Sequence, residues 1–169
     1  MKKLFMMMAL LALPFAMQAQ TKFHDVEANE AKGAVKSITT MAKGEHKVIN
    51  FTKDGKMQQE GMSEVKYDAK GYIQSFKLEN KGMIIPVTYK WANGRVTKVT
   101  MTVMGRETLT TTTYNEKGEV VSMTTSMGGQ NMTVTCSDYK YDARGNWISR
   151  KINLMGQEVE TTRTIEYYE

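Results

Sequence analysis

The sequence has few of the residues from which proteins build covalent cross-links and catalytic pairs. Its 169 residues include one cysteine, two histidines and two prolines. The lone Cys136 excludes an internal disulfide. Cys136 follows Met132 and Val134 at a spacing of two, so the three side chains share one face of a strand, and we expect a buried, unreactive thiol there. An intermolecular disulfide or a reactive thiol is the alternative.

Catalytic motifs are also missing. Neither His24 nor His46 lies beside a nucleophile motif, and the chain has no G-x-S-x-G, H-E-x-x-H, P-loop or dinucleotide-binding glycine pattern. We therefore predict a protein that is not an enzyme and that needs no cofactor. A small hydrolase stays open as an alternative, because acidic side chains could pair across strands as they do in glycosidases. The acids considered for that role are Glu64, Asp68, Glu158 and Glu160.

Metal-binding spacings are absent in the same way. Met123 and Met127 share a strand face, and with His46 they could form a thioether-rich copper(I) site. Methionine at core positions of a strand more often fills gaps in the packing. The sequence has neither the cysteine and histidine spacing of a zinc site nor an acidic calcium loop. We expect no metal.

The N-terminus has the three parts of a secretory signal peptide. Lys2 and Lys3 are followed by the almost wholly apolar residues 4–17 and by a small residue at Ala19. The apolar run is too short for a stable membrane span, and a retained membrane anchor is the alternative to a signal peptide. Residues 1–19 are therefore predicted to be removed, which leaves a secreted or periplasmic chain that does not span the membrane. Loss of the two lysines lowers the net charge from +5 to +3, which is too small to indicate nucleic acid.

A repeated pattern dominates the remainder: an aromatic residue, a short polar turn, a glycine and then an aliphatic residue or methionine. A second series of glycine turns alternates with it at intervals of about ten residues. Each interval is long enough for one strand, so the two series of turns should lie at opposite ends of a sheet. The five units are FTKDGKM (51–57), YDAKGYI (67–73), WANGRV (91–96), YNEKGEV (114–120) and YDARGNWI (141–148).

The intervals alternate between apolar and polar residues. In residues 83–91, for example, every second side chain is apolar, which is typical of a strand with one buried face. We predict an all-β protein: an antiparallel meander of about 10–12 strands, built from repeated hairpins and curled into a barrel-like or sandwich sheet. Residues 34–169 form this single domain. Residues 20–33 precede it, with a short helix over residues 25–33 that is capped by Asp25 and ended by Gly33.

The turns have a mechanical explanation. In the segment from Asp68 to Gly71, the aspartate can accept hydrogen bonds from backbone amides, and the glycine supplies the left-handed conformation. The other units carry the same or a shorter turn. The residues predicted to form these turns are Asp68, Gly71, Gly94, Gly118, Asp142 and Gly145.

The units YDAKGYI, YNEKGEV and YDARGNWI resemble the YD (RHS-type) repeats of bacterial secreted and surface proteins. The arrangement over residues 47–169 is similar to that of small bacterial envelope proteins with a few degenerate YD-like units. The resemblance implies strand–turn–strand architecture and a place in the cell envelope. It does not imply a particular ligand.

Aromatic residues near the turns are the candidates for binding, although their repetition at every turn favours a structural role, in which cross-strand packing fixes the register. We predict a secreted, non-catalytic binding or structural module that meets a glycan or an envelope protein at an aromatic rim. The alternative is a periplasmic carrier that holds an apolar ligand such as lipid inside an incompletely closed sheet. Alternation places Trp147 on the face opposite Ile148, so its exposure is the open question. The candidate ligand-binding residues are Trp91, Tyr141, Trp147 and Tyr168.

Overall fold

The computed structural model describes residues 23–169, which form one short helix and one sheet of twelve antiparallel strands. The structure confirms the predicted all-β meander. The predicted signal peptide, residues 1–19, lies outside the described residues. The elements are α1 (Asp25–Ala28), β1 (Val35–Ala42), β2 (Glu45–Phe51), β3 (Met57–Gln58), β4 (Met62–Tyr67), β5 (Ile73–Asn80), β6 (Met83–Ala92), β7 (Arg95–Val103), β8 (Arg106–Tyr114), β9 (Val120–Met127), β10 (Gln130–Tyr141), β11 (Trp147–Leu154) and β12 (Gln157–Tyr167).

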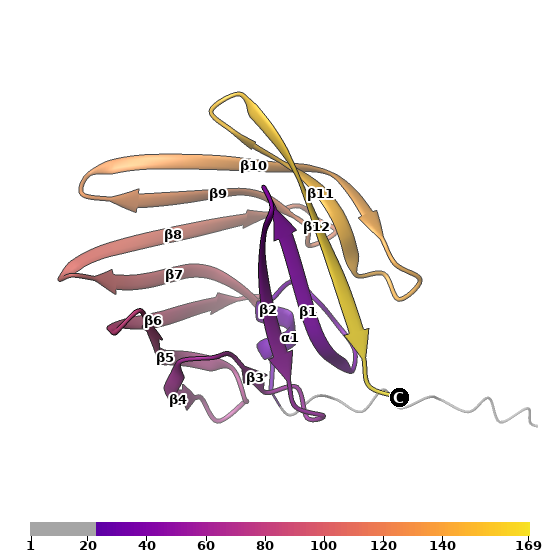
Figure 1. Ribbon diagram of the computed structural model, residues 1–169, viewed down its shortest axis with the longest axis horizontal. Coiled ribbons are helices and arrows are strands. Elements are labelled where there is room, and N and C mark those ends of the chain that lie inside the picture. The colour runs from indigo at the N-terminus through magenta and orange to yellow at the C-terminus, as the bar shows by residue number, and fades with distance from the viewer. Residues whose placement is uncertain (1–22) are drawn as a thin grey trace, which may run out of the picture.

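The sheet curls until it is nearly closed into a barrel (Figure 1). Each strand from β4 onward pairs with the next strand in the sequence, and β12 then pairs with β1. The two free edges are therefore β3 and β4, which follow one another along the chain. The open seam of the barrel lies between them.

Alternate hairpins lie at opposite ends of the barrel. One end, called here the corner end, carries the hairpins that contain the five repeated units. The opposite end, called here the tip end, carries two-residue turns in which both residues have positive φ, as type I′ hairpins require. The tip-end turns are Lys43-Gly44, Lys81-Gly82, Met104-Gly105, Gly128-Gly129 and Met155-Gly156.

Four of the five corners share one hydrogen-bonding pattern. Oδ1 of Asp142 accepts from the backbone N–H groups of Arg144 and Asn146, both at 2.9 Å, and Gly145 has a φ of 74°. Side chains at the equivalent position hold three other corners in the same way. These acceptors are Thr52 for the amide of Lys56, Asp68 for those of Lys70 and Tyr72, and Asn115 for that of Glu119.

Most corners also contain a β-bulge. Tyr141 pairs with Trp147 and Lys140 with Ser149, so Ile148 is the extra residue on β11. The bulge breaks the alternation of side chains at this point. As a result the Trp147 side chain is buried, at 7% exposure, although strict alternation would place it on the face opposite Ile148. The extra residues in the other bulged corners are Gln74, Thr97 and Val121.

The helix is shorter than predicted. It ends at Ala28 rather than near Gly33, and His24 rather than Asp25 occupies the N-cap position. The Asp25 side chain does not cap the helix because its carboxylate is buried against the sheet. The prediction over residues 25–33 was therefore correct only in placing a helical turn there.

The core is uneven around the barrel. Helix α1 packs with strands on the β1–β6 side, where Val26, Phe51, Ile73 and Val87 are buried in one cluster. The inner face of β7–β10 is mostly half-buried instead. A cavity of about 240 Å³ lies against that face, lined by residues that include Val99, Thr110 and Met123.

Candidate functional site

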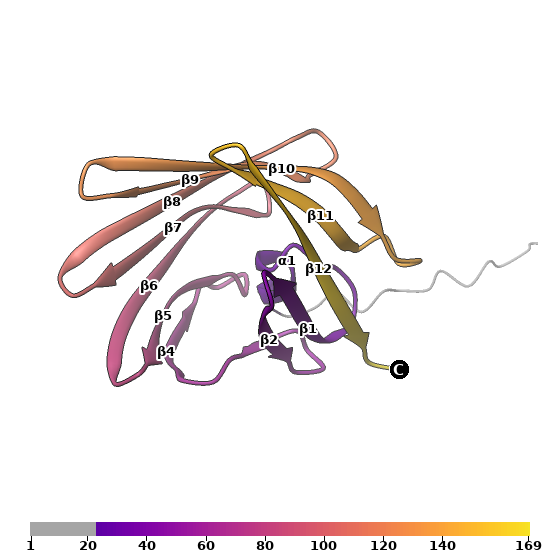
Figure 2. The same ribbon diagram turned by 45° about the horizontal axis from the view of Figure 1, so that its top comes forward.

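The N-terminal segment, residues 23–34, lies inside the curve of the sheet and is called here the plug (Figure 2). Asp25 fixes its first part. Oδ2 of this fully buried residue accepts from the backbone N–H of Met57, at 2.7 Å, and from the hydroxyl of Tyr67, at 2.8 Å. Met57 lies on β3 and Tyr67 on β4. One carboxylate therefore joins the two free edges of the sheet.

Arginines from the C-terminal strands hold the second part of the plug. Arg163 on β12 donates to the carbonyls of Asn29, at 2.9 Å, and Glu30, at 2.6 Å. Arg150 on β11 donates to the Glu30 carboxylate at 2.7 Å. Two arginines thus hold the backbone and the Glu30 carboxylate of the plug against β11 and β12.

Trp147 lies against both arginines. The guanidinium carbon of Arg163 is 3.7 Å from the centroid of the indole ring, and that of Arg150 is 4.2 Å from it. Both distances are within the range of cation–π attraction. Burial lowers the pKa of Arg163 to about 10, which leaves the side chain charged at neutral pH. Trp147 is thus part of the packing around the plug.

Aromatic side chains connect neighbouring corners. Trp91 donates through Nε1 to the carbonyl of Ile73 at 2.7 Å. Tyr114 donates to Val96 at 2.7 Å, and Tyr139 donates to Val120 at 2.8 Å. In each case the acceptor belongs to the preceding corner. Burial raises the pKa of both tyrosines to about 12, so their hydroxyls stay protonated and keep donating at neutral pH.

The C-terminal tyrosines are also fixed in place. Tyr168 donates to the carbonyl of Phe51 at 2.5 Å, which ties the end of the chain to β2. Tyr167 donates to the Asp142 carboxylate and accepts from the amide of Asn146 at 2.8 Å. Both tyrosines are half-buried. Their contacts stabilise the corner end.

A pocket of about 450 Å³ lies at the corner end, between the plug and the corners of β6–β11, and is called here the corner pocket. Aromatic rings and charged groups of both signs line it. Tyr141 is the exposed ring among them, and its hydroxyl donates to Glu119. The aromatic lining residues are Tyr72, Tyr114, Tyr139, Tyr141 and Trp147, and the charged ones are Glu27, Glu30, Glu119, Lys32, Arg95 and Lys117.

The structure brings two of the four predicted binding residues together. Tyr141 and Trp147 both line the corner pocket, whereas Trp91 and Tyr168 do not. Sequence reasoning missed Arg150 and Arg163. The signal for Arg163 was present, because it lies two residues from Ile165 on the apolar face of β12, where a charged side chain interrupts the alternation.

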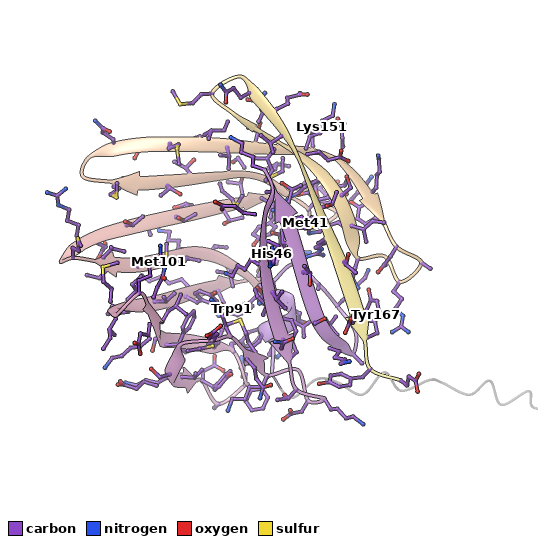
Figure 3. The ribbon with its side chains drawn as sticks, viewed as in Figure 1. Met41, His46, Trp91, Met101, Lys151 and Tyr167 are labelled. Atoms are coloured by element: carbon purple, nitrogen blue, oxygen red, sulfur yellow. The ribbon has the colours of Figure 1, made fainter. Side chains whose placement is uncertain are left out.

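The acids considered for a hydrolase have separate partners, and the candidate copper ligands are divided between β2 and β9. Among the proposed hydrolase acids, Glu64 pairs with exposed Lys77 and Glu160 accepts from Ser149. His46 lies on β2 opposite Met41 of β1 (Figure 3), whereas Met123 lies on β9. Within residues 23–169, no group of three or more histidine, cysteine, aspartate or glutamate side chains is arranged to hold a metal ion.

Residues 23–169 contain no helix with the length and apolar character needed to cross a membrane. Comparison with protein-family models and with curated proteins finds no match to the chain.

Proposed function

We propose that this chain is a secreted, non-catalytic binding module of the bacterial cell envelope, and that its ligand is an uncharged glycan held in the corner pocket. The composition of the pocket carries the proposal. Three acidic and three basic side chains line it, so their charges balance and favour a neutral ligand. Aromatic rings beside polar groups suit a sugar, which has apolar ring faces and a rim of hydroxyls.

The rigidity of the pocket wall also supports a binding site. The corners that form its wall are braced by hydrogen bonds between neighbouring corners, from Tyr114 and Tyr139. A wall fixed in this way loses little conformational entropy when a ligand binds. Tyr141, with an exposed ring, is the residue best placed to stack on a sugar.

The test is a titration of the purified mature chain with a panel of neutral oligosaccharides, followed by saturation-transfer NMR and calorimetry. Tyr141→Ala should weaken binding about tenfold, the loss expected for one stacking contact. Val121→Ala is the matched control, because Val121 is also exposed beside a corner but does not line the pocket. Trp147 is unsuited to this test, since its loss would also disturb the plug.

Equal affinity for the wild type and Tyr141→Ala would refute the site, and no binding across the panel would refute the ligand class. The predicted location has its own measurement. N-terminal sequencing of the chain recovered from the periplasm or medium should begin near Gln20. A chain that keeps Met1 in the cytoplasm would contradict it.

A second candidate function is carriage of an apolar ligand, and the cavity of about 240 Å³ against β7–β9 favours it. Val96, Val99, Val120 and Met123 give this cavity an apolar lining, with threonines between them. A carrier should retain lipid through purification, visible by native mass spectrometry as added mass. Met123→Trp, which fills the cavity, should remove that mass, and a wild-type protein free of lipid would count against the carrier.

A further inference from the structure

The tip end of the barrel concentrates exposed apolar side chains. Ten large hydrophobic residues are exposed within the described part of the chain. Met41 lies beside the tip-end turn of β1–β2, and six others lie in, or within three residues of, the tip-end turns of the hairpins β5–β6, β7–β8, β9–β10 and β11–β12. We call these six the methionine rim. They are Met83, Ile84, Met104, Met127, Met132 and Met155.

At two of these positions methionine is unfavourable for two independent reasons. Met104 and Met155 occupy the first position of type I′ turns, with φ of 50° and 51°, a conformation that favours glycine and asparagine. Asn93, in the equivalent turn at the corner end, follows that preference. Both methionine side chains are also almost fully exposed, at 85% and 89%. Neither backbone preference nor packing within the chain accounts for methionine at these positions.

Contact with an apolar phase outside the protein would account for methionine at these two positions. A methionine that leaves water on contact gains the free energy of burying its side chain, and its flexible thioether adapts to irregular surroundings. The rim residues come from separate hairpins whose turns project individually (Figure 1). The rim residues line neither the corner pocket nor the cavity against β7–β9. Separate projections fit a deformable surface better than a shaped protein groove.

The charges near the rim indicate which kind of apolar surface it would contact. Within three residues of the four rim turns there are two basic and three acidic side chains, so the local net charge is −1. A surface of this kind gains no electrostatic attraction to anionic lipid. The five are Lys81, Arg106, Glu79, Glu107 and Glu158. We infer that the methionine rim docks the protein on a zwitterionic lipid surface, with the corner pocket facing away from it.

The experiment is flotation of the mature chain with phosphatidylcholine vesicles. The wild type should float with the vesicles, and raised salt should not release it. Met104→Asn/Met155→Asn should bind at least about tenfold more weakly, because two apolar anchors are lost. Asparagine suits the positive φ, so the variant should melt at the same or a higher temperature. Reduced binding therefore cannot be attributed to unfolding.

The matched control is Lys43→Asn/Lys81→Asn, which makes the same change at the same turn position in two other tips. This control should keep wild-type flotation. Three results would overturn the inference: a wild type that stays with the soluble fraction, binding that requires phosphatidylglycerol and is lost in high salt, or equal flotation of the methionine variant. Concentration-dependent dimers in sedimentation velocity, abolished by the methionine variant, would assign the rim to a second copy of the chain instead. The inference does not depend on the glycan proposal, since the two sites lie at opposite ends.

Discussion

Arg163 lies over the indole ring of Trp147, with its guanidinium carbon 3.7 Å from the ring centroid, and donates to the carbonyl of the same residue at 2.5 Å. The remaining donors of this arginine reach the carbonyls of Asn29 and Glu30. One side chain therefore joins β12, the last corner and the plug. The relationship explains why a charged residue is buried on a face that is otherwise largely apolar.

Replacing Arg163 should detach the plug. Arg163→Met leaves three carbonyls without their donor and should lower the free energy of unfolding by about 3 kcal/mol. Hydrogen exchange should also quicken at residues 25–31, because their anchor is lost. The measurements are urea unfolding and exchange detected by mass spectrometry.

Lys151→Met is the control for that change, since Lys151 lies on the neighbouring strand and its side chain is about half exposed. It should alter stability by no more than about 0.5 kcal/mol. Faster exchange spread evenly over the whole sheet after Arg163→Met would show that the arginine supports the barrel as a whole rather than the plug.

The sheet was predictable from the sequence because its determinants are local. Alternation of apolar and polar residues gave the strands, and glycine in the left-handed conformation marked both series of turns. In the YDARGNWI unit, Asp142 and Gly145 contribute their turn contacts within the unit itself. Nothing distant in the sequence was needed.

The plug was not predictable because its determinants are long-range. Asp25 contacts Met57 and Tyr67, and Arg163 contacts residues more than a hundred positions earlier. A sequence pattern assigns charged residues to the surface, and only the closed sheet brings these charges inside. The bulge at Ile148 likewise reversed the face that alternation gives to Trp147.

The Asp25 carboxylate should give stability a measurable pH dependence. Burial raises its pKa above the usual 3.8, and hydrogen bonds from Met57 and Tyr67 oppose the rise only in part. A raised pKa in the folded state stabilises the fold when the group is protonated. That contribution is complete below pH 3.8 and is lost as the pH rises through the higher folded-state pKa. Asp25→Asn has no such titration.

The stability of Asp25→Asn relative to the wild type should therefore improve between acid and neutral pH. Urea unfolding of both proteins across that interval measures the difference. Asp25→Ala, which removes both accepting contacts, should be destabilised by about 2–3 kcal/mol throughout. Parallel curves for Asp25→Asn and the wild type would mean that the carboxylate titrates alike in the folded and unfolded chains.

The thiol of Cys136 should be unreactive in the folded protein. The residue is buried, and burial raises the pKa of its thiol, so little thiolate forms near neutral pH. An opening free energy of about 3 kcal/mol would slow its reaction with an aromatic disulfide reagent about a hundredfold. The rate is measured with and without urea. A fast native reaction would place the thiol at the surface and reopen its assignment as a reactive group.

Gly61 lies in the link between β3 and β4, and Gly82 lies in the turn between β5 and β6; together they test how tightly that link is packed. Gly61 and Gly82 have nearly equal φ, 75° and 77°, so alanine should meet the same backbone penalty of about 1 kcal/mol at both. A Cβ at Gly82 would meet open space, whereas one at Gly61 would lie 2.4 Å from the carbonyl oxygen of Glu79.

Gly61→Ala should therefore cost about 1–3 kcal/mol more than Gly82→Ala in urea unfolding, because a backbone atom cannot rotate aside as a side chain can. Gly61 also accepts from the amide of Glu79 at 2.8 Å, which fixes the link between β3 and β4. Hydrogen exchange at the start of β4 should rise in this variant and stay unchanged in Gly82→Ala. Equal costs for the two variants would mean that the link between β3 and β4 moves freely.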